Sequence, residues 1–119
     1  MAIATVARRD YARYDTDVAA MVTSPTLRIS VKMLSISAGG AMFRMDRLSS
    51  KVFEDDRFTL DIPGIGRIAA NKKWRRDTDL GCKFDLTDQD RLRLADRLEQ
   101  LFGRAPSKMQ LASVNTPRP

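Results

Sequence analysis

The strongest constraint on the fold is a period-two alternation of apolar and polar residues that recurs between residues 28 and 84. Ile29, Val31 and Met33 alternate with Arg28, Ser30 and Lys32. Successive side chains of a strand point to opposite faces of a sheet, so this pattern predicts strands with one buried and one exposed side. Turn-forming residues separate the alternating segments: Gly39-Gly40, Pro63-Gly64 and Asp77-Thr78-Asp79. The sequence therefore predicts short antiparallel strands joined by tight turns.

Six strands are expected within residues 16–85, at about 17–23, 28–36, 41–45, 57–62, 66–75 and 80–84. At Leu34 the apolar phase slips by one residue, which predicts a bulge or bend. Residues 46–56 are polar and predict a loop, with Leu48, Val52 and Phe53 anchored in the core. Six such strands favour a closed antiparallel barrel, because closure leaves no sheet edge exposed.

A helix is predicted over about 87–102. Thr87 can cap its first turn, with Asp90 in the capping-box position, and Gly103 stands where a left-handed C-terminal cap is expected. An apolar stripe runs along it at helical spacing: Leu94, Ala95, Leu98, Leu101 and Phe102. We expect this stripe to pack on the barrel; a partner-binding groove is the alternative. The predicted fold is mainly β, a six-stranded antiparallel barrel with a C-terminal α-helix.

The 119 residues suffice for one domain. We expect a flexible N-terminus at 1–7, the folded domain at 8–103 and a disordered tail at 104–119. No apolar run approaches the roughly 18 residues of a membrane span, and the N-terminus lacks the basic region of a signal peptide. A single cysteine, Cys82, cannot form an internal disulfide. These features predict a cytoplasmic protein.

The charge balance favours anionic partners, because the net charge is +6 and the pI is near 10. The chain has no histidine and one cysteine. This excludes a Ser-His-Asp triad, a Cys-His pair and a tetrahedral zinc site of nitrogen and sulfur ligands. No paired-carboxylate arrangement stands out either. The residues indicate a binding module rather than an enzyme.

Two segments carry the candidate binding residues. Arg8, Arg9 and Arg13 precede the first strand, and Ser35, Ser37 and Gly39-Gly40 surround a turn between strands. The guanidinium fork matches both phosphate oxygens and the O6 and N7 atoms of guanine. Glycine allows close approach of a ligand to the backbone. We expect the fold to join the two segments in a basic pocket for a phosphate-bearing, guanine-like ligand.

The two segments resemble the motifs of the PilZ domain family, bacterial receptors for cyclic di-GMP. The first family motif, R-x-x-x-R, is matched by Arg9 and Arg13. The second, [D/N]-x-S-x-x-G, is matched by Ser37 and Gly40, with Ser35 where Asp or Asn is usual. The resemblance covers roughly residues 8–103.

The resemblance implies that Arg9 and Arg13 bind phosphates and guanine edges, and that Ser37 and the Gly40 region hold the opposite side of the ligand. An arginine at the position of Arg8 is associated in this family with two stacked ligand molecules. A single-domain member is expected to signal to a protein partner in the flagellar, secretion or polysaccharide-synthesis machinery, and so to control motility, secretion or biofilm formation.

Trp74, flanked by Lys72, Lys73, Arg75 and Arg76, has two interpretations. It can stack on a guanine face, or it can fill the barrel core or pack against the helix. Tyr11 and Tyr14 are expected at the barrel rim, and Cys82 is expected to be a small buried apolar residue.

Two other functions remain open. The chain could be a degenerate family member that binds a protein partner without nucleotide. It could also be a small basic barrel that binds single-stranded nucleic acid. Only 7% of its residues are aromatic, however, which disfavours a nucleic-acid surface built from stacked bases.

Overall fold

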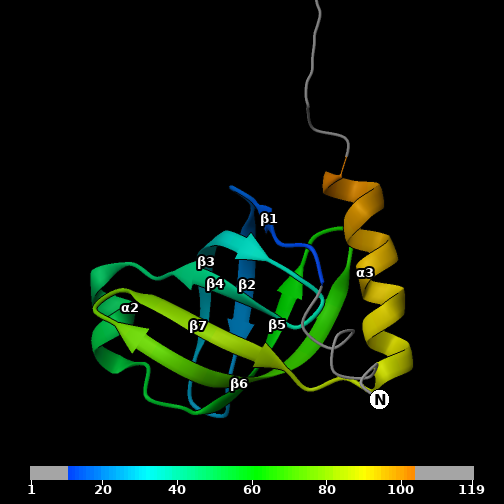
Figure 1. Ribbon diagram of the computed structural model, residues 1–119. Coiled ribbons are helices and arrows are strands. Elements are labelled where there is room, and N and C mark those ends of the chain that lie inside the picture. The colour runs from blue at the N-terminus through cyan, green and yellow to red at the C-terminus, as the bar shows by residue number, and fades with distance from the viewer. Residues whose placement is uncertain (1–10, 104–119) are drawn as a thin grey trace, which may run out of the picture.

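The computed structural model describes residues 11–103 and shows a closed barrel with a helix packed against one end (Figure 1). Arg8, Arg9, the N-terminus at 1–7 and the tail at 104–119 lie outside the described residues. The elements are β1 (Tyr14–Asp15), β2 (Ala19–Thr23), β3 (Arg28–Ile36), β4 (Gly40–Arg44), α2 (Arg47–Val52), β5 (Arg57–Ile62), β6 (Gly66–Arg76), β7 (Asp79–Phe84) and α3 (Asp88–Phe102).

The barrel has the strand order β3-β2-β5-β6-β7-β4, and β4 pairs back onto β3 to close it. All pairings are antiparallel. The predicted six-stranded barrel is therefore confirmed. Strand β1 was not predicted; its two residues pair with β3 beyond the end of β2.

Two register shifts interrupt the ladders. One lies between Met33 and Ser35 in β3 and confirms the bulge expected at Leu34. The other lies between Lys72 and Trp74 in β6, so that Lys73 has no direct partner on β7. Bulges re-aim side chains and bend strands, and both of these border the same outer region of the barrel.

The barrel interior is filled by the apolar side of each strand. Phe43, Phe53 and Phe58 form its aromatic centre, with ring centroids 5.8 Å apart for Phe43–Phe58 and 5.6 Å for Phe53–Phe58. Leu94 and Leu98 of α3 are buried against this core. The apolar stripe of the helix is thus mainly a packing surface, as expected.

The prediction of a loop at 46–56 was wrong, because residues 47–52 form the short helix α2. Asp46 caps it by accepting a hydrogen bond from the Ser49 amide (2.7 Å). Leu48 and Val52 are 76% and 59% exposed, so they do not anchor the loop to the core; only Phe53 does. A six-residue helix presents one narrow face inward, and here that face carries the buried Ser50.

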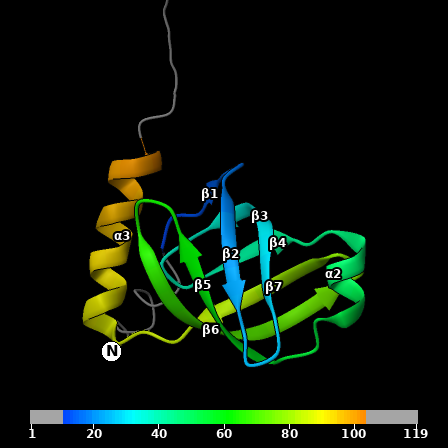
Figure 2. The same ribbon diagram turned by 180° about the vertical axis from the view of Figure 1, so that it is seen from behind.

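Helices α2 and α3 lie at opposite ends of the barrel (Figures 1 and 2). Thr87 caps α3 as predicted, accepting from the Asp90 amide (3.1 Å). The left-handed cap expected at Gly103 was wrong: this residue has φ −69° and ψ −16°, in the right-handed helical region. Its N–H donates to the carbonyl of Glu99 (2.8 Å), so the helical path continues through it.

Candidate functional site

The candidate site lies on the outer face of the barrel, across four neighbouring strands. Ser35 of β3 pairs with Met42 of β4, Met42 with Gly81 of β7, and Gly81 with Trp74 of β6. Directly paired residues of antiparallel strands present their side chains on the same face. This cross-strand row therefore forms a continuous surface that ends at the indole of Trp74.

A cavity of about 620 Å³ opens above this row. The described residues that line it include three cations and no acidic side chain. Its lining is Tyr11, Arg13, Ser35, Ser37, Gly39, Gly40, Ala41, Met42, Lys73, Trp74, Gly81, Cys82 and Lys83.

Strand β1 brings the arginine segment to the serine-glycine turn. Tyr14 pairs with Ile36, which places Arg13 beside the end of β3. The Arg13 Nη1 atom donates a hydrogen bond to the Ser35 Oγ atom (3.2 Å). Of the two motif arginines, the structure describes Arg13, and its side chain contacts Ser35 of the second motif.

Hydrogen bonds within the turn hold Ser37 and Gly40 in place. The Ser37 Oγ atom accepts from the Gly39 amide (3.1 Å), and the Ser37 amide donates to the Gly40 carbonyl (2.8 Å). A Cβ on Gly40 would lie 2.1 Å from the carbonyl oxygen of Cys82. The packing of β4 against β7 therefore already requires glycine here, whatever a ligand needs.

Trp74 is 39% exposed and lines the cavity, so the interpretation that it fills the barrel core was wrong. The Trp74 indole packs against Gly81, where there is no side chain. A Cβ on Gly81 would lie 2.2 Å from the Trp74 Nε1 atom. The guanidinium carbon of Arg76 is 6.0 Å from the ring centroid, within cation–π range. The indole is therefore only partly exposed at the cavity.

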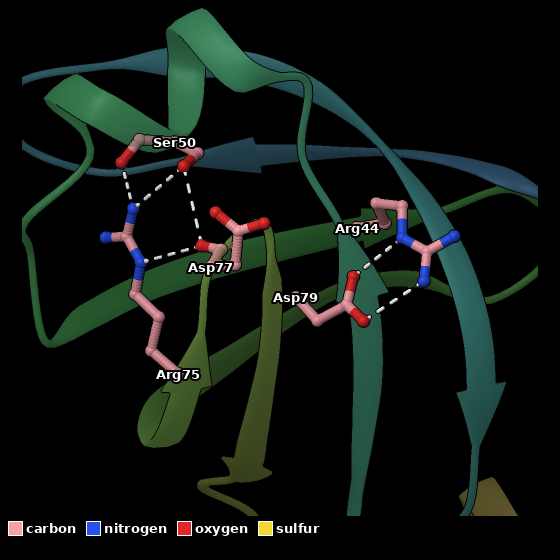
Figure 3. Close-up of polar contacts among 5 residues, drawn as sticks. All are labelled: Arg44, Ser50, Arg75, Asp77 and Asp79. Carbon is pink, nitrogen blue, oxygen red and sulfur yellow. Dashed lines mark hydrogen bonds and ion pairs between the residues drawn. The ribbon is translucent and has the colours of Figure 1, made fainter.

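The four cations around Trp74 have different roles. Lys73 lines the cavity, whereas Lys72 forms an ion pair with Asp56 (2.9 Å). Arg75 points to α2 and donates to the carbonyl oxygens of Ser50 and Phe53; Figure 3 shows its contacts with Ser50 and Asp77. It anchors the C-terminal end of that helix, where backbone carbonyls favour a cation.

Gly81 and Lys83 also line the cavity, and neither was predicted from the sequence. A glycine inside an alternating strand signals close approach of another group, and Lys83 faces outward between the buried Cys82 and Phe84. Neither signal shows on which face of the barrel, or near which other strands, the two residues lie. Cys82 is 4% exposed, as predicted, and burial raises the pKa of its thiol to about 12.

A closed barrel with a basic, aromatic-edged pocket on its outer face defines a small binding domain for anionic ligands. The sequence model of the PilZ domain matches residues 7–100, and the chain belongs to this family of cyclic di-GMP receptors, whose domains are generally not catalytic. A search of curated proteins finds no significant match. None of the described helices is long and apolar enough to cross a membrane.

Solved structures share the fold at low sequence identity. The PilZ domain of YcgR from Escherichia coli with c-di-GMP matches with a TM-score of 0.57 and 13% identity, over 82% of this chain and 92% of that one. An uncharacterized Legionella protein gives 0.55 and 17%, over 76% and 94%. The Bacillus subtilis inhibitor of motility MotI gives 0.56 and 15%, over 83% of this chain and 54% of that chain.

Proposed function

We propose that the chain is a cyclic di-GMP receptor that binds the dinucleotide in the outer pocket and signals to a protein partner. The hydrogen bond between Arg13 and Ser35 (3.2 Å) carries the proposal, because it joins the two motif segments at the pocket. The three described cations suit two phosphodiesters, and the exposed indole of Trp74 suits a purine face. Cations and an aromatic ring can bind a dinucleotide without any covalent step.

In this proposal Arg13 and Arg9 contact phosphate and guanine edges, and Trp74 stacks on a base. Ser37 and Gly40 hold the opposite side of the ligand. The roles of Arg8 and Arg9, and a second stacked ligand at Arg8, follow from the family resemblance, since both residues lie outside 11–103. The partner would belong to a flagellar, secretion or polysaccharide-synthesis system that controls motility or biofilm formation.

Isothermal titration calorimetry with cyclic di-GMP tests the proposal. Arg13→Ala should weaken binding at least tenfold, since a charge-assisted hydrogen bond contributes about 1.5–3 kcal/mol. The protein should stay folded with a slightly lower thermal midpoint, because Arg13 is exposed but the buried Ser35 hydroxyl loses its hydrogen bond. Arg67→Ala is the matched control: Arg67 is an exposed arginine of β6 outside the pocket. The absence of binding to the unmodified protein at roughly 50 µM ligand would refute the proposal.

The protein-adaptor alternative has one observation in its favour. Ser35 replaces the usual Asp or Asn, is 4% exposed, and already accepts a hydrogen bond from Arg13. Its short hydroxyl offers no carboxylate to a guanine edge, and the lost contact is worth about 1.5–3 kcal/mol. Under the receptor proposal Ser35→Asp should tighten binding about tenfold, whereas an adaptor would bind no nucleotide in either form.

A further inference from the structure

Lys83 lies on the pocket side of β7, directly opposite the second motif. It pairs with Gly40 across the β4–β7 ladder, and the Phe84 amide donates to the Gly39 carbonyl (2.9 Å). Cys82 and Phe84 on either side of Lys83 are buried, so Lys83 points outward. Lys83 and Gly40 both line the cavity beside the turn.

Lys73 approaches the same cavity from the next strand. It is the residue left without a direct β7 partner at the β6 bulge, and it is exposed. Lys73 and Lys83, which we call the lysine pair, both line the cavity. Arg13 approaches from the other side, since β1, β3, β4 and β7 are successive neighbours. Three strand spacings separate β1 from β7 by about 14 Å along the curved sheet.

Several surface cations of the barrel are neutralised by ion pairs, whereas the lysine pair is not. Lys32 pairs with Asp17 at 3.0 Å and Arg44 with Asp79 at 2.7 Å. Within residues 11–103, neither member of the lysine pair forms a salt bridge. Among the described residues, no acidic side chain lines the cavity they share. Unneutralised cations that converge on one concave surface raise the local concentration of anions.

We propose that the lysine pair is a second phosphate-binding group, which acts on the opposite side of the ligand from Arg13. The pocket would then select ligands with two separated anionic groups, such as a cyclic dinucleotide, over ligands with a single phosphate. An ammonium group suits this role because it acts as a compact point charge with three donors. The inference rests on the proposed function and assigns Lys83 the larger share, because it stands next to the serine-glycine turn.

Calorimetry with cyclic di-GMP at roughly 50 and 300 mM salt tests the inference, because salt screens charge–charge contacts. Lys83→Met keeps the aliphatic stem and removes the charge. It should bind about tenfold more weakly at low salt and lose part of the salt dependence. Lys83→Arg should bind nearly as tightly as the unmodified protein. Lys51→Met is the control, because Lys51 is an exposed lysine of α2 outside the cavity.

Circular dichroism of each variant checks folding, and recovery of binding in Lys83→Arg separates loss of charge from damage to the strand. If Lys83→Met binds with the affinity and salt dependence of the unmodified protein, the lysine pair is not a phosphate-binding group, while the receptor proposal stands. If the unmodified protein fails to bind, the receptor proposal fails, and the inference fails with it.

Discussion

At the residue scale, two glycines of the pocket differ in what a methyl group would meet. A Cβ on Gly81 would lie 2.2 Å from the Trp74 Nε1 atom and 2.3 Å from Cε2, so the indole would have to move. A Cβ on Gly39 would meet only the Ser37 hydroxyl, at an ordinary 3.8 Å. Gly81 therefore sets the position of the ring, whereas Gly39 tolerates a side chain.

We predict that Gly81→Ala displaces Trp74 and weakens cyclic di-GMP binding about tenfold, the lower range for loss of one stacked base. Trp74 is the only tryptophan, so its fluorescence spectrum should shift in the same variant. Gly39→Ala should leave the spectrum unchanged, because its Cβ would meet only the Ser37 hydroxyl. Equal effects of the two substitutions would show that the Gly81–Trp74 contact does not control the site.

Cys82 provides a second prediction at this scale. Burial raises its thiol pKa to about 12, and the thiolate is the reactive species. The native protein should therefore react very slowly with Ellman's reagent near pH 8, and urea should expose a fast-reacting thiol. Rapid labelling of the folded protein would mean that β7 opens locally.

At the element scale, β6 places adjacent residues in two different roles. Trp74 lines the pocket, and Arg75 holds the end of α2 through the carbonyls of Ser50 and Phe53. We predict that Trp74→Ala weakens ligand binding with little loss of stability. Arg75→Met should lower the free energy of unfolding by about 1.5–3 kcal/mol and leave the dissociation constant unchanged. Chemical denaturation and calorimetry on both variants check this separation.

The same strand shows how far the sequence could predict the elements. The Pro63-Gly64 turn located β6 as the return strand, and the phase slip of the apolar residues located the bulge at Leu34. Residues 71–76 are polar or charged apart from Trp74, so no alternation marked the second bulge. Without that register, the position of Lys73 and the pairing of Trp74 with Gly81 could not be predicted. The helix α2 was likewise missed, because Leu48 and Val52 were expected to be buried anchors of a loop but are exposed.

The pairing of β4 with β7 makes stability depend on pH. The Arg44 guanidinium donates to both carboxylate oxygens of Asp79 (2.7 and 3.1 Å; Figure 3), and this hydrogen bonding lowers the pKa of Asp79. A carboxyl whose pKa is lower in the folded state stabilises the fold above its unfolded pKa of about 4. That contribution is lost as pH falls through the folded value.

We therefore predict that the urea midpoint stays nearly constant between pH 7 and 5 and falls below about pH 4. Hydrogen bonds from Ser49 lower the pKa of Asp46, which adds to the same trend. Asp79→Asn should be less stable at neutral pH and should lose less on acidification. A parallel pH profile for the two proteins would exclude Asp79 as a source of the effect.

At the scale of the whole molecule, the strands separate the core from the site. Inward side chains fill the barrel and meet α3, while outward side chains of β3, β4, β7 and β6 form the pocket. The alternation therefore predicted the closed barrel and its core well. It could not predict the complete pocket, which depends on how closure brings β1 and β6 to the same outer face.

This separation predicts that substitutions in the core lower the stability of the fold without changing its affinity for cyclic di-GMP. Leu98 of α3 is fully buried, so Leu98→Ala should lower the free energy of unfolding by about 2–5 kcal/mol. Leu101, 41% exposed on the same helix, is the matched control, and Leu101→Ala should cost less than about 1 kcal/mol. Well below its melting temperature, Leu98→Ala should bind cyclic di-GMP with an unchanged dissociation constant, because no residue of α3 lines the pocket. Weaker binding by a variant that is still folded would show instead that the helix and the pocket are coupled through the barrel wall.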